Sequence, residues 1–208
     1  NVNTGFKLNP DDTENARVSV DGQAVRPSQR MVYIALNKPR GYVCSCRHAG
    51  KKIVLELVNV PERVYPVGRL DKESTGLLLL TNDGRLHLKL SHPSFDHEKE
   101  YDVVVGRPIS DGALRRMAEG MPILKTLTRP AQVHRIGERQ FRIVLREGRN
   151  RQIRRMVRRL GNDVVELKRR FGRSSFRTGK GVTFLSTNRA GSSTWRSATT
   201  TDACGRRR

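Results

Sequence analysis

A run of four leucines, Leu77 to Leu80, lies between two turn signals and restricts most strongly how this chain can fold. Four successive leucines leave no face for water, so the run predicts a strand that is buried on both sides. Thr75-Gly76 precedes the run and Asn82-Asp83-Gly84 follows it, and both are typical of turns. Asp71 lies just before this strand. A carboxylate at that point can be held in one place for chemistry, although an isolated loop aspartate more often only accepts hydrogen bonds from turn amides.

The net charge indicates what kind of partner the chain binds. Its 208 residues include 41 lysines and arginines against 20 acids, which gives a net charge of +21. An excess of this size points to a polyanion and favours nucleic acid over an anionic membrane. No apolar stretch approaches the ~20 residues needed to cross a bilayer. The hydrophobic share of 36% still supports a folded domain rather than a disordered basic tail.

The cysteines and histidines do not form a ligand pattern. Cys44 and Cys46 lack a second pair and Cys204 lies far along the chain, so we expect neither a disulfide framework nor a metal site. Few cysteines without a framework favour a reducing compartment, here the cytoplasm. The chain begins with Asn1 and has no signal-like apolar segment, which suggests a fragment of a longer protein.

The rest of the chain contains several short predicted strands and helices. Apolar or alternating runs predict strands at 16–20, 33–36, 101–105 and 141–145. Leu86 to Leu90 predicts a short helix, and Ser110 is a good N-cap for a second helix that ends at Gly120. Residues 53–58 fit either a helix or a strand.

Residues 151–160 predict a helix with an unusual polar face. Apolar side chains recur at 153, 156, 157 and 160, which is one helical stripe against a core. The remaining surface is arginine: Arg151, Arg154, Arg155, Arg158 and Arg159. Five arginines in nine positions, with no acid between them, favour a phosphate-binding surface over a simply solvated face. A membrane-surface helix is the weaker alternative, because the apolar stripe lacks Trp and Phe.

Four motifs together resemble one enzyme family. The chain contains Y-I-A-L-N-K-P-R-G at 33–41, G-R-L-D-K-E-S-T-G-L-L-L-L-T-N-D-G at 68–84, H-E-K-E-Y at 97–101 and E-G-R-N-R-Q-I-R-R-M at 147–156. From about residue 15 to 167 it resembles the RsuA/RluB/RluE/RluF family of ribosomal RNA pseudouridine synthases. The resemblance implies an α+β fold with a central, mainly antiparallel mixed sheet. It also implies isomerisation of uridine to pseudouridine in ribosomal RNA, without a cofactor or metal.

The resemblance assigns a role to several residues. Asp71 matches the essential aspartate, and Tyr101 matches the tyrosine that packs on the target base. Arg149 aligns with the arginine that pairs with the carboxylate, and Arg69 resembles the residue that fills the space left by the flipped nucleotide. A fixed arginine would keep the carboxylate ionised. A core aromatic for Tyr101 and a phosphate contact for Arg149 remain open. We expect further RNA contacts from Lys38, Arg151, Arg154, Arg155 and Arg158.

The resemblance also divides the chain into three parts. Residues 1–30 are expected to be a partial S4-like RNA-binding domain, and residues 31–168 the catalytic domain. Residues 169–208 follow the family pattern poorly apart from Trp195-Arg196, so we expect a divergent tail that is either disordered or altered by a frameshift. The expected partner is 23S-like ribosomal RNA or an assembling ribosomal subunit, bound by a monomer away from any membrane. A catalytically inactive RNA-binding or ribosome-associated protein is the competing hypothesis, because charge alone would support it equally.

Overall fold

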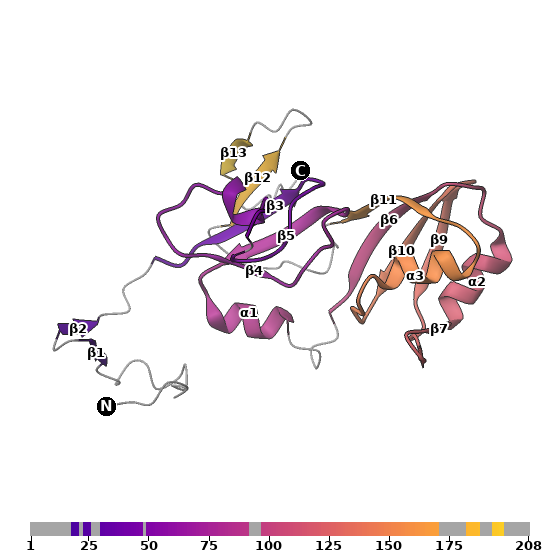
Figure 1. Ribbon diagram of the computed structural model, residues 1–208, viewed down its shortest axis with the longest axis horizontal. Coiled ribbons are helices and arrows are strands. Elements are labelled where there is room, and N and C mark those ends of the chain that lie inside the picture. Colours follow the sequence, from indigo (N-terminus) through magenta and orange to yellow (C-terminus); the bar gives the residue numbers. More distant parts are fainter. Residues whose placement is uncertain are drawn as a thin grey trace, which may run out of the picture. The chain divides into compact units, whose positions relative to one another are not determined.

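A computed structural model describes residues 18–20, 23–25, 30–47, 49–91, 97–170, 182–187 and 193–197 (Figure 1). The chain forms two units, residues 1–31 and 32–208. In the first unit, β1 (Val18–Val20) and β2 (Gln23–Val25) pair as an antiparallel hairpin. The strand expected at 16–20 is therefore observed from Val18 onward. In the described part of the chain, no helix is long and apolar enough to cross a bilayer.

The second unit is built on a mixed sheet of nine strands in the described residues. Their order is β13-β12-β3-β5-β11-β6-β10-β9, and β4 pairs separately with β5. Neighbouring strands are antiparallel except for β12 with β3 and β11 with β5, so the expected mainly antiparallel mixed sheet is confirmed. The strands are β3 (Tyr33–Lys38), β4 (Tyr65–Val67), β5 (Thr75–Thr81), β6 (Lys99–Val105), β9 (Gln132–Gly137), β10 (Gln140–Leu145), β11 (Val164–Arg169), β12 (Val182–Thr187) and β13 (Ser193–Ser197).

The leucine run forms most of β5, as predicted. Leu77, Leu78 and Leu80 are buried, whereas Leu79 is only partly buried. One edge of β5 pairs with β3 along its length, and the other edge pairs with β4 and then with β11. Because β5 is hydrogen-bonded on both edges and apolar on both faces, it is a rigid support for the loop that precedes it.

The helices follow the sequence pattern closely. α1 (Gly84–Ser91) and α2 (Asp111–Glu119) lie where expected, and the Ser110 hydroxyl caps α2 by accepting a 3.2 Å hydrogen bond from the Ala113 amide. Residues 53–58, ambiguous in sequence, contain a 3-10 helix, Val54–Leu57. α3 (Gln152–Arg159) buries Ile153, Met156 and Val157, as its apolar stripe predicts. A two-stranded hairpin, β7 (Pro122–Ile123) and β8 (Thr126–Leu127), completes this unit.

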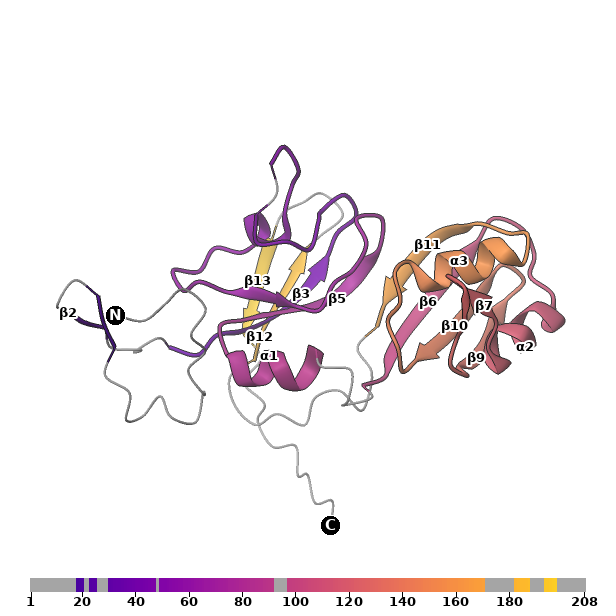
Figure 2. The ribbon, with the colours of Figure 1, turned by 60° about the horizontal axis from the view of Figure 1, so that its bottom comes forward.

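Two hydrophobic clusters hold the second unit together. One surrounds β3 and β5, and the other lies among β6, β10, α2 and α3. α2 packs against β9, and α3 packs against β11 (Figure 2). Tyr101, on β6, packs against both clusters. The sheet around this tyrosine is therefore supported from both cores.

Part of the expected tail joins the sheet. β12 pairs in parallel with β3, and β13 pairs with β12. The remaining residues of the tail, 171–181, 188–192 and 198–208, lie outside the described residues, as do residues 1–17, 21–22 and 26–29 of the expected S4-like segment.

Candidate active site

The loop before β5 holds Asp71 in a fixed backbone conformation. Gly68 starts the loop with φ +76°, and Leu70 is buried with its amide donating to the Cys44 thiol at 3.2 Å. The Ser74 amide donates to the backbone oxygen of Asp71 at 3.0 Å. The turn thus uses the backbone of Asp71, and its carboxylate is left to point elsewhere.

Lys38, which we expect from the sequence to bind RNA, is instead fully buried at 0% exposure. Its ammonium donates to the backbone oxygens of Ser74 at 2.7 Å, Pro39 at 3.0 Å and Lys72 at 3.3 Å. Burial lowers the pKa of Lys38, although the negative charges of Glu73 and Asp71 act in the opposite direction. Lys38 therefore fixes the Asp71 loop from beneath and cannot reach a phosphate, because three carbonyl groups satisfy all three of its donors.

Two arginines of the α3 segment face the Asp71 carboxylate. Arg154 Nε lies 3.8 Å and Arg151 Nη1 lies 4.0 Å from Asp71 Oδ2. Both distances suit an ion pair but exceed the length of a hydrogen bond. The two guanidinium groups balance the charge of Asp71. Its side chain is 28% exposed, so part of the carboxylate remains accessible.

Arg154 is the buried member of this pair of cations. Its side chain is only 13% exposed, against 46% for Arg151. Burial lowers the pKa of Arg154, the nearby Arg151 charge lowers it further, and Asp71 opposes both effects. Its Nη1 donates weakly to the Val164 oxygen at 3.4 Å, whereas Nε and Nη2 have no hydrogen-bond acceptor among the protein atoms. These donors are available to a ligand that approaches Asp71.

Tyr101 lies close enough to Asp71 to feel its charge. Burial raises the pKa of the Tyr101 phenol, and the Asp71 carboxylate raises it further against the opposing effect of Arg169. The phenol is therefore neutral at physiological pH. A neutral aromatic ring near this carboxylate could stack on a planar base.

Arg149, the arginine we expect to pair with Asp71, binds a different carboxylate. Its Nε lies 3.0 Å from Glu147 Oε2, Nη2 donates to the Leu127 oxygen at 2.6 Å, and Nη1 donates to Thr126 Oγ1. Since Glu147 is only two residues away, the local carboxylate captures this guanidinium. The expected pairing is therefore wrong for this structure, and Arg154, which we expect to bind RNA, lies in its place.

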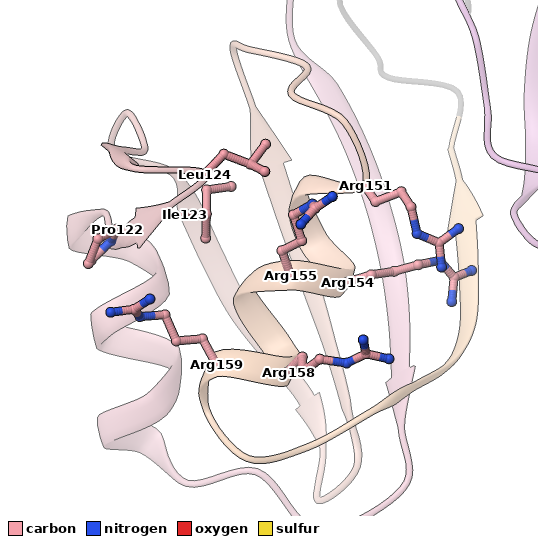
Figure 3. Close-up of a pocket in the computed structure, with 8 residues that line it drawn as sticks. All are labelled: Pro122, Ile123, Leu124, Arg151, Arg154, Arg155, Arg158 and Arg159. Atoms are coloured by element: carbon pink, nitrogen blue, oxygen red, sulfur yellow. The ribbon is translucent and has the colours of Figure 1, made fainter.

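Arginines of α3, together with Arg151 just before it, line a cavity (Figure 3). The cavity has a volume of about 430 Å³. Its lining is Pro122, Ile123, Leu124, Arg151, Arg154, Arg155, Arg158 and Arg159. Arg155 and Arg158 thus lie on the expected basic surface, and Arg69 is exposed in the Asp71 loop. Arg159, which belongs to the arginine surface expected from the sequence, lines the same cavity.

An ion-pair network on the neighbouring strands was not visible in the sequence. Asp102 accepts hydrogen bonds from Arg142 at 2.8 Å and Arg170 at 2.7 Å, and Glu100 lies 3.1 Å and 3.5 Å from the same two side chains. On β6, Glu100 directly precedes Tyr101 and Asp102 directly follows it. In the sequence, the acids on either side of Tyr101 are the only sign of this network, because Arg142 on β10 and Arg170 after β11 are both far from Tyr101 along the chain. In the described residues, no group of three or more His, Cys, Asp or Glu side chains could hold a metal ion.

Comparison with known proteins gives a consistent result. The model of the RNA pseudouridylate synthase family matches residues 32–159. The dual-specificity RNA pseudouridine synthase RluF of Shigella flexneri is 45% identical over 154 residues, which are 73% of this chain and 53% of the relative. The ribosomal large subunit pseudouridine synthase B of Bacillus subtilis is 37% identical over 165 residues, which are 76% of this chain and 67% of the relative.

A solved structure supports the same fold. A crystal structure of pseudouridylate synthase is similar with a TM-score of 0.65 and 32% identity, over 70% of this chain and 64% of that one. The chain spans about half the length of the RluF relatives that it matches, between 53% and 56% of each.

Proposed function

This chain belongs to the RNA pseudouridylate synthase family, and on that premise we propose that it isomerises a selected uridine of ribosomal RNA to pseudouridine. The observation that carries the proposal is the position of Asp71, which faces Arg154 and Arg151 at 3.8 Å and 4.0 Å beside Tyr101. A protein that only binds RNA gains nothing from a carboxylate inside a basic surface, because the acid repels phosphate.

The chemistry needs an ionised carboxylate at a nucleoside that has left its helix. The reaction breaks the bond from C1′ to N1 and forms a bond from C1′ to C5, after which C5 loses a proton and N1 gains one. Asp71 would attack the sugar or the base, or remove a sugar proton, while the base detaches and rotates. Arg154 and Arg151, at 3.8 Å and 4.0 Å, would balance the negative charge of Asp71 in this site.

Tyr101 and Arg69 would stabilise the extruded nucleotide. Flipping a base out of a duplex costs a few kcal/mol, and stacking on an aromatic ring returns about 1–3 kcal/mol. Tyr101 supplies this ring from β6, where both cores fix it. Arg69 is exposed in the Asp71 loop and would occupy the space that the flipped nucleotide leaves.

We place the target in 23S-like ribosomal RNA, free or in an assembling subunit. The support is the relative named for the large ribosomal subunit. The β1–β2 hairpin would be the remnant of an S4-like domain that docks this RNA, and the protein would act as a monomer. Such a substrate implies that the protein works where ribosomes are assembled, in the cytoplasm.

Tritium release tests this function directly. Large-subunit and small-subunit ribosomal RNA, each labelled with tritium at uridine C5, are incubated separately with the protein. We expect release from the large-subunit RNA, and none when Asp71→Ala replaces the wild type. Glu73→Ala is the matched control, because Glu73 lies on the same turn and pairs with the exposed Arg40 at 2.9 Å. If the folded wild type binds RNA but releases no tritium, the protein is a ribosome-associated binder and the proposal is wrong.

A further inference from the structure

The cavity between α3 and the β7–β8 hairpin is more than an extension of the Asp71 site. Arg151 and Arg154 line its end and also face Asp71, so the cavity begins at the proposed reacting group. Arg155, Arg158 and Arg159 follow along α3, and Pro122, Ile123 and Leu124 form the opposite wall (Figure 3). At about 1.5 Å per residue, α3 carries cations roughly 12 Å beyond Arg151, which is longer than a single phosphate group requires.

Strained backbone surrounds this cavity. In the described part of the chain, three residues other than glycine have positive φ: Leu124 at 50°, Lys125 at 63° and Arg151 at 51°. Leu124 and Arg151 line the cavity, and Lys125 is the neighbour of Leu124 at the hairpin tip. Each such residue costs about 1–3 kcal/mol, and strain of this kind tends to occur at functional sites. A two-residue turn of this type normally uses Asn-Gly, so a Leu-Lys tip is not explained by folding alone.

The cations of the cavity also repel one another. Arginines at i, i+3 and i+4 on one helix face destabilise it by about 0.2–0.5 kcal/mol per pair. Protein acids offset little of this: Arg158 reaches only Asp163 at 3.9 Å and is 82% exposed. Arg155 donates to the backbone and amide oxygens of Asn150, which are uncharged. Arg159 has no carboxylate within 4.0 Å among the described residues. An anionic ligand would remove this repulsion.

Hydrogen bonds fix the β7–β8 hairpin that forms the apolar wall of the cavity, and part of this wall is exposed to solvent. Arg149 ties β8 to the loop before α3 through Thr126 and Leu127, and Glu147 accepts a 3.1 Å hydrogen bond from the Arg129 amide. The cavity is therefore formed before a ligand arrives. Leu124 is 47% exposed at the tip. An apolar side chain opposite a row of guanidinium groups matches a ligand that has both an apolar face and a phosphate.

We propose that this cavity binds the RNA strand that flanks the target uridine. Arg155, Arg158 and Arg159 hold successive phosphates of that strand, and Leu124 packs against one of its bases. The proposal rests on the proposed function, because Asp71 marks where the strand meets the reacting nucleotide. It adds to that function a substrate-positioning site that explains the strained hairpin and the row of like charges.

The salt dependence of RNA binding tests the phosphate contacts. The probe is unlabelled large-subunit ribosomal RNA transcript, bound by wild type and by Arg155→Gln/Arg159→Gln at several salt concentrations. Each lost phosphate contact on a single strand reduces the slope of log affinity against log salt by about 0.7, so the double variant should lose about 1.4. Arg63→Gln/Arg139→Gln is the matched control, since it removes the same charge from positions that do not line the cavity. Each single Arg→Gln variant should show half the effect.

Leu124→Ser separates the apolar contact from the charged ones. We expect its affinity to fall about fivefold to tenfold with an unchanged salt slope, because it removes buried apolar area but no cation. The proposal is overturned if the double arginine variant keeps the wild-type slope, if the control loses as much, or if Leu124→Ser binds as tightly as wild type. Binding is measured without reference to tritium release, so these outcomes remain distinct from a failure of the proposed isomerisation.

Discussion

Gly76 on β5 pairs with Arg169 on β11 close to the loop that carries Asp71, and Gly76→Ala should disturb this pairing. β5 and β11 pair at two positions, Lys168 with Thr75 and Arg169 with Gly76. Gly76 has φ +104°, and an added Cβ would lie 2.1 Å from the Arg169 carbonyl oxygen. That neighbour is backbone within a sheet and cannot rotate away. The substitution must therefore open the pairing.

Two costs add at this position. The left-handed backbone disfavours alanine by about 1–3 kcal/mol, and the collision adds about 1–3 kcal/mol more, as for an overpacked core. Gly41→Ala carries the first cost only, because Gly41 has φ +95° and an added Cβ there would meet no atom within 4 Å. The free energy of unfolding of Gly76→Ala should thus fall about 2 kcal/mol below that of Gly41→Ala. With a urea dependence of about 2 kcal/mol per M, the midpoint should fall by about 1 M.

Activity should respond to the same change. Asp71 precedes β5 and Arg154 precedes β11, so opening this pairing separates the carboxylate from its buried cation. Tritium release by folded Gly76→Ala should fall well below that of Gly41→Ala, measured without urea at a temperature where both remain folded. Equal urea midpoints for the two variants would refute the reasoning, because the collision with Arg169 would then not exist.

Three further outcomes follow from individual side chains. Arg154→Ala should slow tritium release by about 10²–10³-fold, as for removal of a positioned charged donor. Arg149→Ala should mainly lower the urea midpoint. Similar losses of rate for both variants would contradict the pairing of Arg154 with Asp71 and of Arg149 with Glu147. Lys38→Met should destabilise by about 1–3 kcal/mol in urea and leave the salt slope of RNA binding unchanged, and a reduced slope would place Lys38 at a phosphate. Burial would raise the pKa of Asp102, but hydrogen bonds from Arg142 and Arg170 lower it overall. The ionised Asp102 therefore stabilises the fold above the ordinary carboxyl pKa of about 4, and this stabilisation is lost as pH falls through the lower folded pKa. Urea unfolding at decreasing pH should therefore show a smaller acid loss for Asp102→Asn than for wild type, and parallel curves would show that Asp102 does not contribute.

Features that depend on local pattern could be predicted from the sequence. The apolar run of β5, the stripe of α3 and the Ser110 cap each depend on neighbouring residues, and all three are confirmed. The partner of Asp71 could not be predicted in the same way. Asp71 and Arg154 are far apart in the chain, and which of several arginines reaches the carboxylate depends on where β11 meets β5. Arg149, which we expect from the sequence to pair with Asp71, forms an ion pair with the nearby Glu147.

Lys38 shows the opposite limit of sequence reasoning. A lysine beside Pro39 and Gly41 in a basic chain is expected to be solvated, because an unpaired buried charge is very costly. The structure offsets that cost with three carbonyl oxygens, two of which come from the distant Asp71 loop, 34 and 36 positions away. The burial of Lys38 thus depends on this distant loop, and the residues next to Lys38 in the sequence do not indicate it.

The carboxylates of this chain show how the structural acids differ from Asp71, the acid that we propose for the chemistry. Asp102 accepts hydrogen bonds of 2.7 Å and 2.8 Å from two guanidinium groups, and Glu147 accepts bonds from Arg149, Gln152 and a backbone amide. Hydrogen bonds of this kind stabilise the anion and make it a poorer nucleophile. The Asp71 carboxylate accepts none from the described residues, and its nearest cations stay at 3.8 Å and 4.0 Å. Since Arg154 also keeps two buried donors without acceptors, charge balance at this site is achieved while both partners retain their bonding capacity for a substrate. An acid whose role was to secure a turn would have used that capacity already.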